Sequence, residues 1–269
     1  MCDRMWTVER TLVGFLMYAA AAAWRPGVRP ARRALVTLVC IADALLSWQL
    51  AETGWSWWPA ARAWQPPLQI LAAYWISGGL FVRPQPALET WLAAVDRRVF
   101  DRLALARFIR RAPRALLESF ELSYLCVYAM LPVGFAVAIA LEPTVDADAF
   151  WTPVVVAGLA CYAALPWLQT RPPRALDDQM WIDARRLFSR RVNLFTLRLA
   201  SIQVNTLPSA HAASAVAMAL AVGTVAPAAS VGFHLLAAGI VAGSVLGRYH
   251  FIVDSVLGIA AAVAAYFLL

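Results

Sequence analysis

The fold is decided by two stretches: Asn-Thr-Leu-Pro-Ser-Ala-His at residues 205–211, and Gly-Arg-Tyr-His-Phe-Ile-Val-Asp at residues 247–254. Each stands at the polar end of an apolar run long enough to cross a bilayer. The chain between them has room for one helix out and one helix back. We therefore expect His211 and His250 to lie at the same face of a membrane.

The composition excludes a soluble domain with an ordinary surface. Hydrophobic residues make up 62% of the 269 residues, charged residues 14%, and the mean hydropathy is +0.64. Apolar runs recur along the whole length, at residues 11–24, 34–50, 68–82, 119–141, 150–168, 207–226, 231–247 and 252–269. This pattern predicts an all-α polytopic transmembrane helical bundle, with the shortest run, 11–24, either spanning or lying in the interface.

Three segments are expected along the chain. Residues 1–83 hold the N-terminal membrane spans. Residues 84–118 alternate apolar and charged side chains at helical spacing, which is typical of an amphipathic helix lying on a membrane. Residues 119–269 would form one continuous catalytic bundle of five or six helices.

The charge pattern favours membrane lipids over nucleic acid as the partner. The net charge is +7, and all 23 basic residues are arginines that flank the apolar runs. Placing the runs alternately across a membrane puts 20 of these arginines on the side of the two histidines, which the positive-inside rule assigns to the cytoplasm. The four cysteines are scattered and show no disulfide or metal-site spacing.

The second stretch has the spacing of an oriented nucleophile. His250 and Asp254 are four residues apart, so on a helix their side chains lie on one face. A carboxylate in that place can hold one imidazole nitrogen and leave the other free to react.

The first stretch has the features of an anion site at a helix start. Pro208 suits the first helical position, where a missing N–H costs nothing. The exposed amides of Ser209, Ala210 and His211 would then face an anion, helped by the helix dipole.

Three arginines are candidates for the same anion. Arg171 and Arg174 bracket two prolines after an apolar run, and guanidinium groups match phosphate oxygens. Arg248 stands two residues before His250, where a continuous helix would point it about 200° away. It reaches the site only if the helix breaks between Leu246 and His250, and we predict that break.

Together these stretches resemble the phosphatidic acid phosphatase type 2 superfamily, which includes the vanadium haloperoxidases. That family carries a Pro-Ser-Gly-His-like motif and a His-x-x-x-Asp motif at neighbouring helix ends, after a basic motif. Here Ala210 replaces the commonest glycine, and the family's Ser-Arg pair before the second histidine is Gly243 and Ser244. The family's lysine before the basic motif is Ala164. The Pro-Pro-Arg form is similar to the inositol phosphorylceramide synthase subgroup, and the resemblance covers residues 119–269.

The resemblance implies a metal-independent enzyme with no cofactor, acting on a phosphorylated lipid through a phosphohistidine. It implies His250 as nucleophile, His211 as general acid and base, and Asp254 as the group that orients His250. The phosphate-binding candidates are Arg171, Arg174, Arg248, Ser209 and Ala210. The resemblance also leaves the side of the membrane open, because relatives mostly work on the extracytoplasmic face.

Three functions stay open from the sequence. With water as acceptor the protein is a lipid phosphate phosphatase, and with an alcohol acceptor it is a lipid phosphotransferase. The third is a non-catalytic lipid-binding membrane protein. In each case we expect an integral protein of a prokaryotic inner membrane.

Overall fold

The structure is a computed structural model that describes residues 5–52, 58–176 and 185–269. Within these ranges the regular elements are helices, and one isolated β-bridge pairs Thr170 with Asn205. The helices are α1 (Thr7–Ala22), α2 (Pro30–Ala51), α3 (Trp58–Ala63), α4 (Pro66–Gly79), α5 (Pro86–Arg102), α6 (Leu105–Arg111), α7 (Arg114–Leu141), α8 (Ala147–Ala164), a 3₁₀ turn (Pro173–Ala175), α10 (Phe188–Ala200), α11 (Ala210–Val225), α12 (Pro227–Leu246) and α13 (Ile252–Leu268). The predicted all-α polytopic bundle is confirmed.

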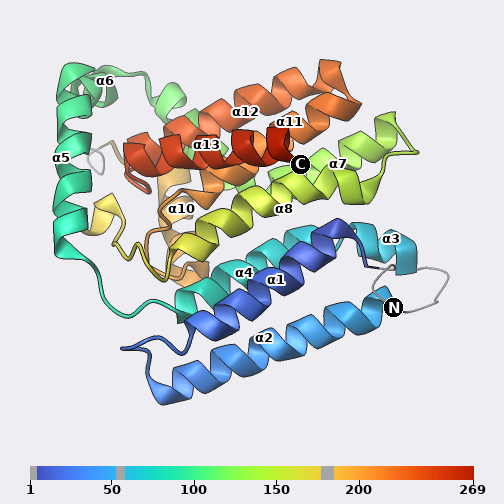
Figure 1. The fold of residues 1–269 in the computed structure, drawn as a ribbon. Coiled ribbons are helices and arrows are strands. Elements are labelled where there is room, and N and C mark those ends of the chain that lie inside the picture. Colours follow the sequence, from blue (N-terminus) through green and yellow to red (C-terminus); the bar gives the residue numbers. More distant parts are fainter. Residues whose placement is uncertain (1–4, 53–57, 177–184) are drawn as a thin grey trace.

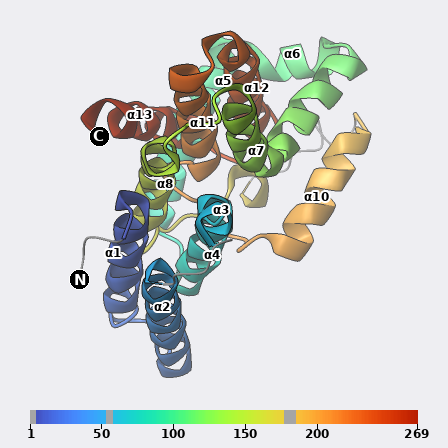
Figure 2. The same ribbon diagram turned by 90° about the vertical axis from the view of Figure 1, so that its right-hand side faces the viewer.

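The long helices run side by side, and α5 stands across one end of them (Figure 1). The view turned by 90° shows α10 at the edge of the same bundle (Figure 2). In the described chain, α2, α7, α8 and α12 are long and apolar enough to cross a membrane, and α11 and α13 are shorter apolar helices. This is a membrane protein.

The centre of the bundle is α11, which packs against α7, α8, α12 and α13. It is rich in alanine and buried on nearly all sides, so its neighbours approach closely. Gly258 of α13 shows how close: a Cβ there would clash with the carbonyl oxygen of Ser209. This contact sets the starts of α11 and α13 side by side.

The element boundaries refine two expectations. The N-terminal run becomes α1, which packs along α2 and α8 within the bundle. The amphipathic segment 84–118 becomes two helices, α5 and α6, separated at Ala104, whose φ of 50° ends the first helix. Its last residues belong to α7, which begins at Arg114 and extends the following span.

One face of α5 is buried, and it includes two carboxylates that the sequence pattern placed among its charged, membrane-surface residues. Glu89 is 5% exposed and Asp96 is 0% exposed, on the same face as Leu92 and Phe100. Carboxylates are rarely buried unless paired, and both are paired here. Glu89 accepts from the main-chain N and guanidinium of Arg171.

Asp96 holds the segment between α12 and α13, which contains Arg248. Its Oδ2 accepts from Arg248, and its Oδ1 accepts from the amide of Ile252 at 2.9 Å. The side of α5 that faces the bundle therefore clamps both the segment after α8 and the segment before α13.

We expect Asp96→Ala to lower the free energy of unfolding by about 3 kcal/mol, because breaking a buried ion pair by removing one partner is costly. The measurement is thermal or denaturant unfolding of the protein in detergent. Asp101→Ala, on the exposed side of the same helix, is the matched control and should stay within about 0.5 kcal/mol. Equal stability of the two variants would show that the pair does not hold α5 in place.

Candidate active site

The start of α11 differs from the sequence prediction by two residues. Ser209 is the N-cap, its Oγ accepts from the amide of Ala212 at 3.3 Å, and the helix begins at Ala210. The amide of Ser209 donates to the main-chain oxygen of Asp254 at 2.9 Å, and that of Ala210 donates to Thr206 Oγ1 at 3.5 Å. Two of the three amides predicted to be free, those of Ser209 and Ala210, are thus engaged, because a serine cap displaces the helix start past Pro208.

The helix break before His250 is confirmed. Helix α12 ends at Leu246, α13 begins at Ile252, and Arg248 between them has a φ of 60°. The main-chain oxygen of Ser244 accepts from the amides of residues 249 and 250 at 2.8 and 3.0 Å. This turn projects His250 from the end of the bundle toward the start of α11.

The structure brings the two histidines together. His250 Nε2 lies 3.2 Å from His211 Nδ1, and His250 Nδ1 lies 3.5 Å from Asp254 Oδ2. One tautomer fits this pattern, with His211 Nδ1–H donating to Nε2 and the Nδ1–H of His250 facing the carboxylate. Burial, and then the nearby charge of Arg174, lowers the pKa of His250 to about 3, so the ring is neutral at pH 7.

Asp254 is fixed more firmly than the 3.5 Å contact alone would do. Its Oδ2 accepts from Asn205 Nδ2 at 2.9 Å and from the amide of Phe251 at 2.8 Å. Its Oδ1 is buried, with no hydrogen-bond partner among the described residues. The carboxylate is therefore held in place beside His250 through Oδ2, while Oδ1 is still able to accept a hydrogen bond.

The three candidate arginines have different surroundings. Within the described ranges, the guanidinium of Arg174 has no hydrogen-bond or ion-pair partner and lies 5.8 Å from the ring centroid of Tyr249. Its charge acts on His250. Arg171 pairs with Glu89 at 2.8 Å.

Arg248 is also engaged, which corrects the expectation that its guanidinium turns into the site. It hydrogen-bonds to Asp96 and stacks 4.9 Å over the ring of Phe100. The reason is that the left-handed turn at residue 248 directs the side chain to the buried face of α5. Of the three arginines, Arg174 is the one left to face an anion.

His211 lies in an aromatic slot that the sequence did not reveal. Its ring stacks on Tyr124 at 5.0 Å between centroids and meets Tyr128 edge-on at 6.0 Å. Tyr124 in turn stacks on Tyr249 at 4.2 Å. These rings set the orientation of the imidazole from the side of α7.

A buried network on α7 and α10 supports the His250 turn, and sequence reasoning missed it. Arg190 Nη1 donates to Glu121 at 3.1 Å and to the main-chain oxygen of Gly247 at 3.0 Å. Glu121 also accepts from Tyr249 Oη at 2.6 Å and from Asn193 Nδ2 at 2.7 Å. One signal was available: Glu121 is an acidic residue inside an apolar span, and such residues are functional candidates by default.

A family model described as the PAP2 superfamily matches residues 90–268, more than half of the chain. The chain belongs to the PAP2 superfamily. This membership suggests an activity of the phosphatase or phosphotransferase type, and it does not single out the inositol phosphorylceramide synthase subgroup. Comparison of this superfamily member with curated proteins and with solved structures found no match. The matched residues include both histidines, and α1 to α4 lie outside them.

Proposed function

We propose that the protein is a lipid phosphate phosphatase that works through a phosphohistidine at His250. The observation that carries this proposal is the position of His250, whose ring lies 3.2 Å from His211 Nδ1 and 3.5 Å from Asp254 Oδ2, close enough to Arg174 for that charge to act on it. A nucleophile with an orienting carboxylate, a second proton carrier and a free cation is what phosphoryl transfer needs.

Substrate binding begins at Arg174, whose guanidinium offsets the charge of the phosphate oxygens. Because Nε2 of His250 is in contact with His211, the phosphoryl group has to displace that contact before attack. Arg171 and Arg248 do not contact the phosphate in this proposal. They pair with Glu89 and Asp96 of α5, and these pairs hold their segments in place.

In the first step Nε2 of His250 attacks phosphorus, the N–P bond forms, and the P–O bond to the lipid alcohol breaks. His211 enters this step as the imidazolium, having bound a proton together with the phosphate dianion, whose negative charge favours the charged ring. It gives that proton to the leaving oxygen and becomes neutral. Asp254 accepts the Nδ1–H of the charged ring and stabilises it. General acid help of this kind contributes about 10² to 10⁴ in rate.

In the second step His211 takes a proton from water, and the water oxygen attacks the phosphohistidine. The N–P bond breaks, inorganic phosphate leaves and the neutral imidazole returns. An alcohol in place of this water would make the same site a lipid phosphotransferase. The proposal needs no metal, because the histidine supplies the nucleophile and the arginine supplies the charge.

We also propose that the site faces the cytoplasm of a prokaryotic cell. The segments at the α5 end of the bundle, 25–33, 83–114, 171–176, 185–198 and Arg248, carry 20 of the 23 arginines. Arginine-rich loops stay on the cytoplasmic side during insertion. Protease or cysteine-labelling accessibility in sealed vesicles tests this orientation.

The test is release of inorganic phosphate from lipid phosphate monoesters by the purified protein in detergent, with EDTA present. We expect turnover that EDTA leaves unchanged and that vanadate inhibits competitively, because a vanadate adduct on His250 resembles the transition state. Transfer to an added alcohol in preference to water would favour the phosphotransferase.

Two results would contradict an enzyme of this kind. Lipid phosphate binding without turnover would favour the non-catalytic function. A strict requirement for a divalent ion would overturn the histidine mechanism.

A further inference from the structure

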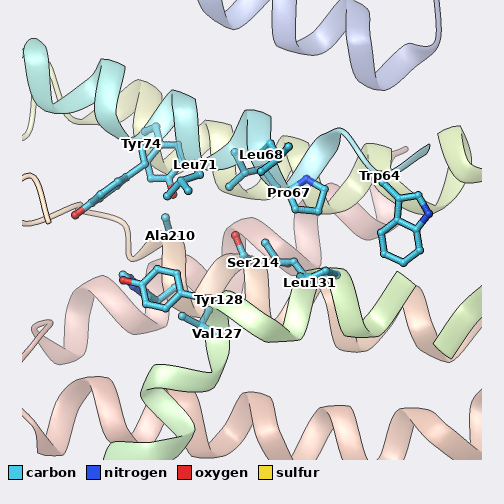
Figure 3. Close-up of a pocket in the computed structure, with 14 residues that line it drawn as sticks. Trp64, Pro67, Leu68, Leu71, Tyr74, Val127, Tyr128, Leu131, Ala210 and Ser214 are labelled. Atoms are coloured by element: carbon cyan, nitrogen blue, oxygen red, sulfur yellow. The ribbon is translucent and has the colours of Figure 1, made fainter. Parts of the chain in front are cut away.

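An apolar pocket of about 390 Å³ lies between α4 and α7, with α8 and α11 forming its inner wall. In Figure 3, Tyr74 stands at one end and Trp64 at the other, and the side chains of Leu71 and Leu68 lie between them. From Pro67 to Tyr74 the pocket follows about 10 Å of helix. It therefore runs along the direction of the membrane spans.

One end of this pocket is part of the candidate active site. His211 and Ala210 line it there, with the rings of Tyr74 and Tyr128 beside them. The other end is closed by Trp64, whose ring meets Phe135 edge-on at 5.0 Å between centroids. The polar reaction centre and the apolar pocket are thus continuous through His211.

The pocket is open on its outer side. Leu68 is 69% exposed and Tyr128 is 46% exposed, whereas Val127 and Leu131 on the inner side are nearly buried. We expect this opening to face the acyl chains of the membrane, because α7 on one side of it is long and apolar enough to span a bilayer. A lipid can enter here sideways without passing through water.

We propose that this pocket holds the hydrocarbon chain of the leaving alcohol, and that the substrate is the phosphate monoester of a long, single-chain primary alcohol. This rests on the proposed function, because His211 protonates the leaving oxygen and also lines the pocket. The chain must therefore begin within a bond or two of that oxygen. A diacylglycerol would have to seat a branched glycerol and two ester groups between Tyr74 and Tyr128.

The size and lining of the pocket suit a hydrocarbon chain. A volume of about 390 Å³ lies in the usual range of small-molecule pockets, and the lining between Tyr74 and Trp64 is mostly apolar. The wall formed by α4 lies outside the residues that match the superfamily, so this pocket depends on the chain's own N-terminal helices.

The first test fills the pocket. Leu71→Trp should lower kcat/KM for dodecyl phosphate at least about tenfold and leave that for butyl phosphate within about twofold, because butyl phosphate reaches the histidines without using the pocket. The matched control is Leu235→Trp, on an exposed face of α12 outside the pocket, which should leave both esters unchanged. Equal effects of Leu71→Trp on the two esters, or no effect on either, would overturn the proposal.

The second test does not depend on turnover. Dodecyl phosphate with a photoreactive diazirine at its tail end should label residues 64–72 in the wild-type protein and in His250→Ala, and Leu71→Trp should lose the label. Labelling of this segment without hydrolysis by the wild-type protein would overturn the phosphatase and keep the pocket. Hydrolysis with labels on other helices would keep the phosphatase and overturn the pocket.

Discussion

His250→Ala is expected to lower turnover by about 10⁴-fold or more, because the attacking nitrogen is deleted and no other nucleophile lies beside it. His211 is 3.2 Å away, but it is stacked on Tyr124 and has no orienting carboxylate among the described residues. The measurement is single-turnover and steady-state phosphate release by the purified variant. Trapping of labelled phosphate on the protein after an acid-free quench should be lost in parallel.

The matched control is His234→Ala. His234 lies on an exposed face of α12, where its Nδ1 contacts the main-chain oxygen of Ser230, and it is outside the site. Both variants should elute as folded protein with similar thermal stability. Activity of His250→Ala above a few per cent of wild type, in a folded protein, would rule out His250 as the nucleophile.

Arg174→Ala should lower kcat/KM by about 10² to 10³, the usual effect of removing one group that stabilises transition-state charge. Arg174→Lys should fall between, because an ammonium keeps the charge and loses the planar pair of donors. The reason to single out this arginine is that its guanidinium has no carboxylate partner in the described chain. The measurement is kcat/KM for one lipid phosphate, together with the inhibition constant of vanadate, for the wild type and for both Arg174 variants.

Arg171→Ala is the comparison, with an expected loss below about tenfold. Its guanidinium is about half exposed and paired with Glu89, so its removal loosens a segment without deleting a phosphate contact. A larger loss for Arg171→Ala than for Arg174→Ala would reverse the assignment. The phosphate would then have to exchange places with Glu89.

Much of the fold could be predicted from the sequence because a bilayer imposes length and hydropathy on every span. The run at 252–269 becomes α13 with nearly the same bounds. The helix break before His250 is present, although Arg248, whose role in the site was the reason for predicting it, pairs with Asp96 instead. The start of α11 was placed wrongly, because proline and serine both suit helix starts. Only the packing against Asp254 shows that Ser209 is the cap.

The partners of the arginines could not be predicted, since they depend on contacts between segments far apart in the chain. The amphipathic pattern of residues 84–118 assigns Glu89 and Asp96 to the membrane surface, because such a pattern does not tell which polar residues face a second layer of protein. Arg190 and Asn193 were missed for the same reason: they meet Glu121 across about 70 residues of sequence. Only tertiary packing separates Arg174 from the other two arginines.

The clamp on α5 has a consequence for where a working unit of this protein can be cut. Residues 90–268 carry the superfamily match, yet the acceptor for Arg171 is Glu89, one residue earlier. A chain trimmed to the match would keep both histidines and lose one of the two carboxylates that fasten their surroundings, together with α4. We therefore expect the independently working unit to be larger than its family portion, and we expect that portion, grafted onto other N-terminal helices, to lack the contacts that hold the site.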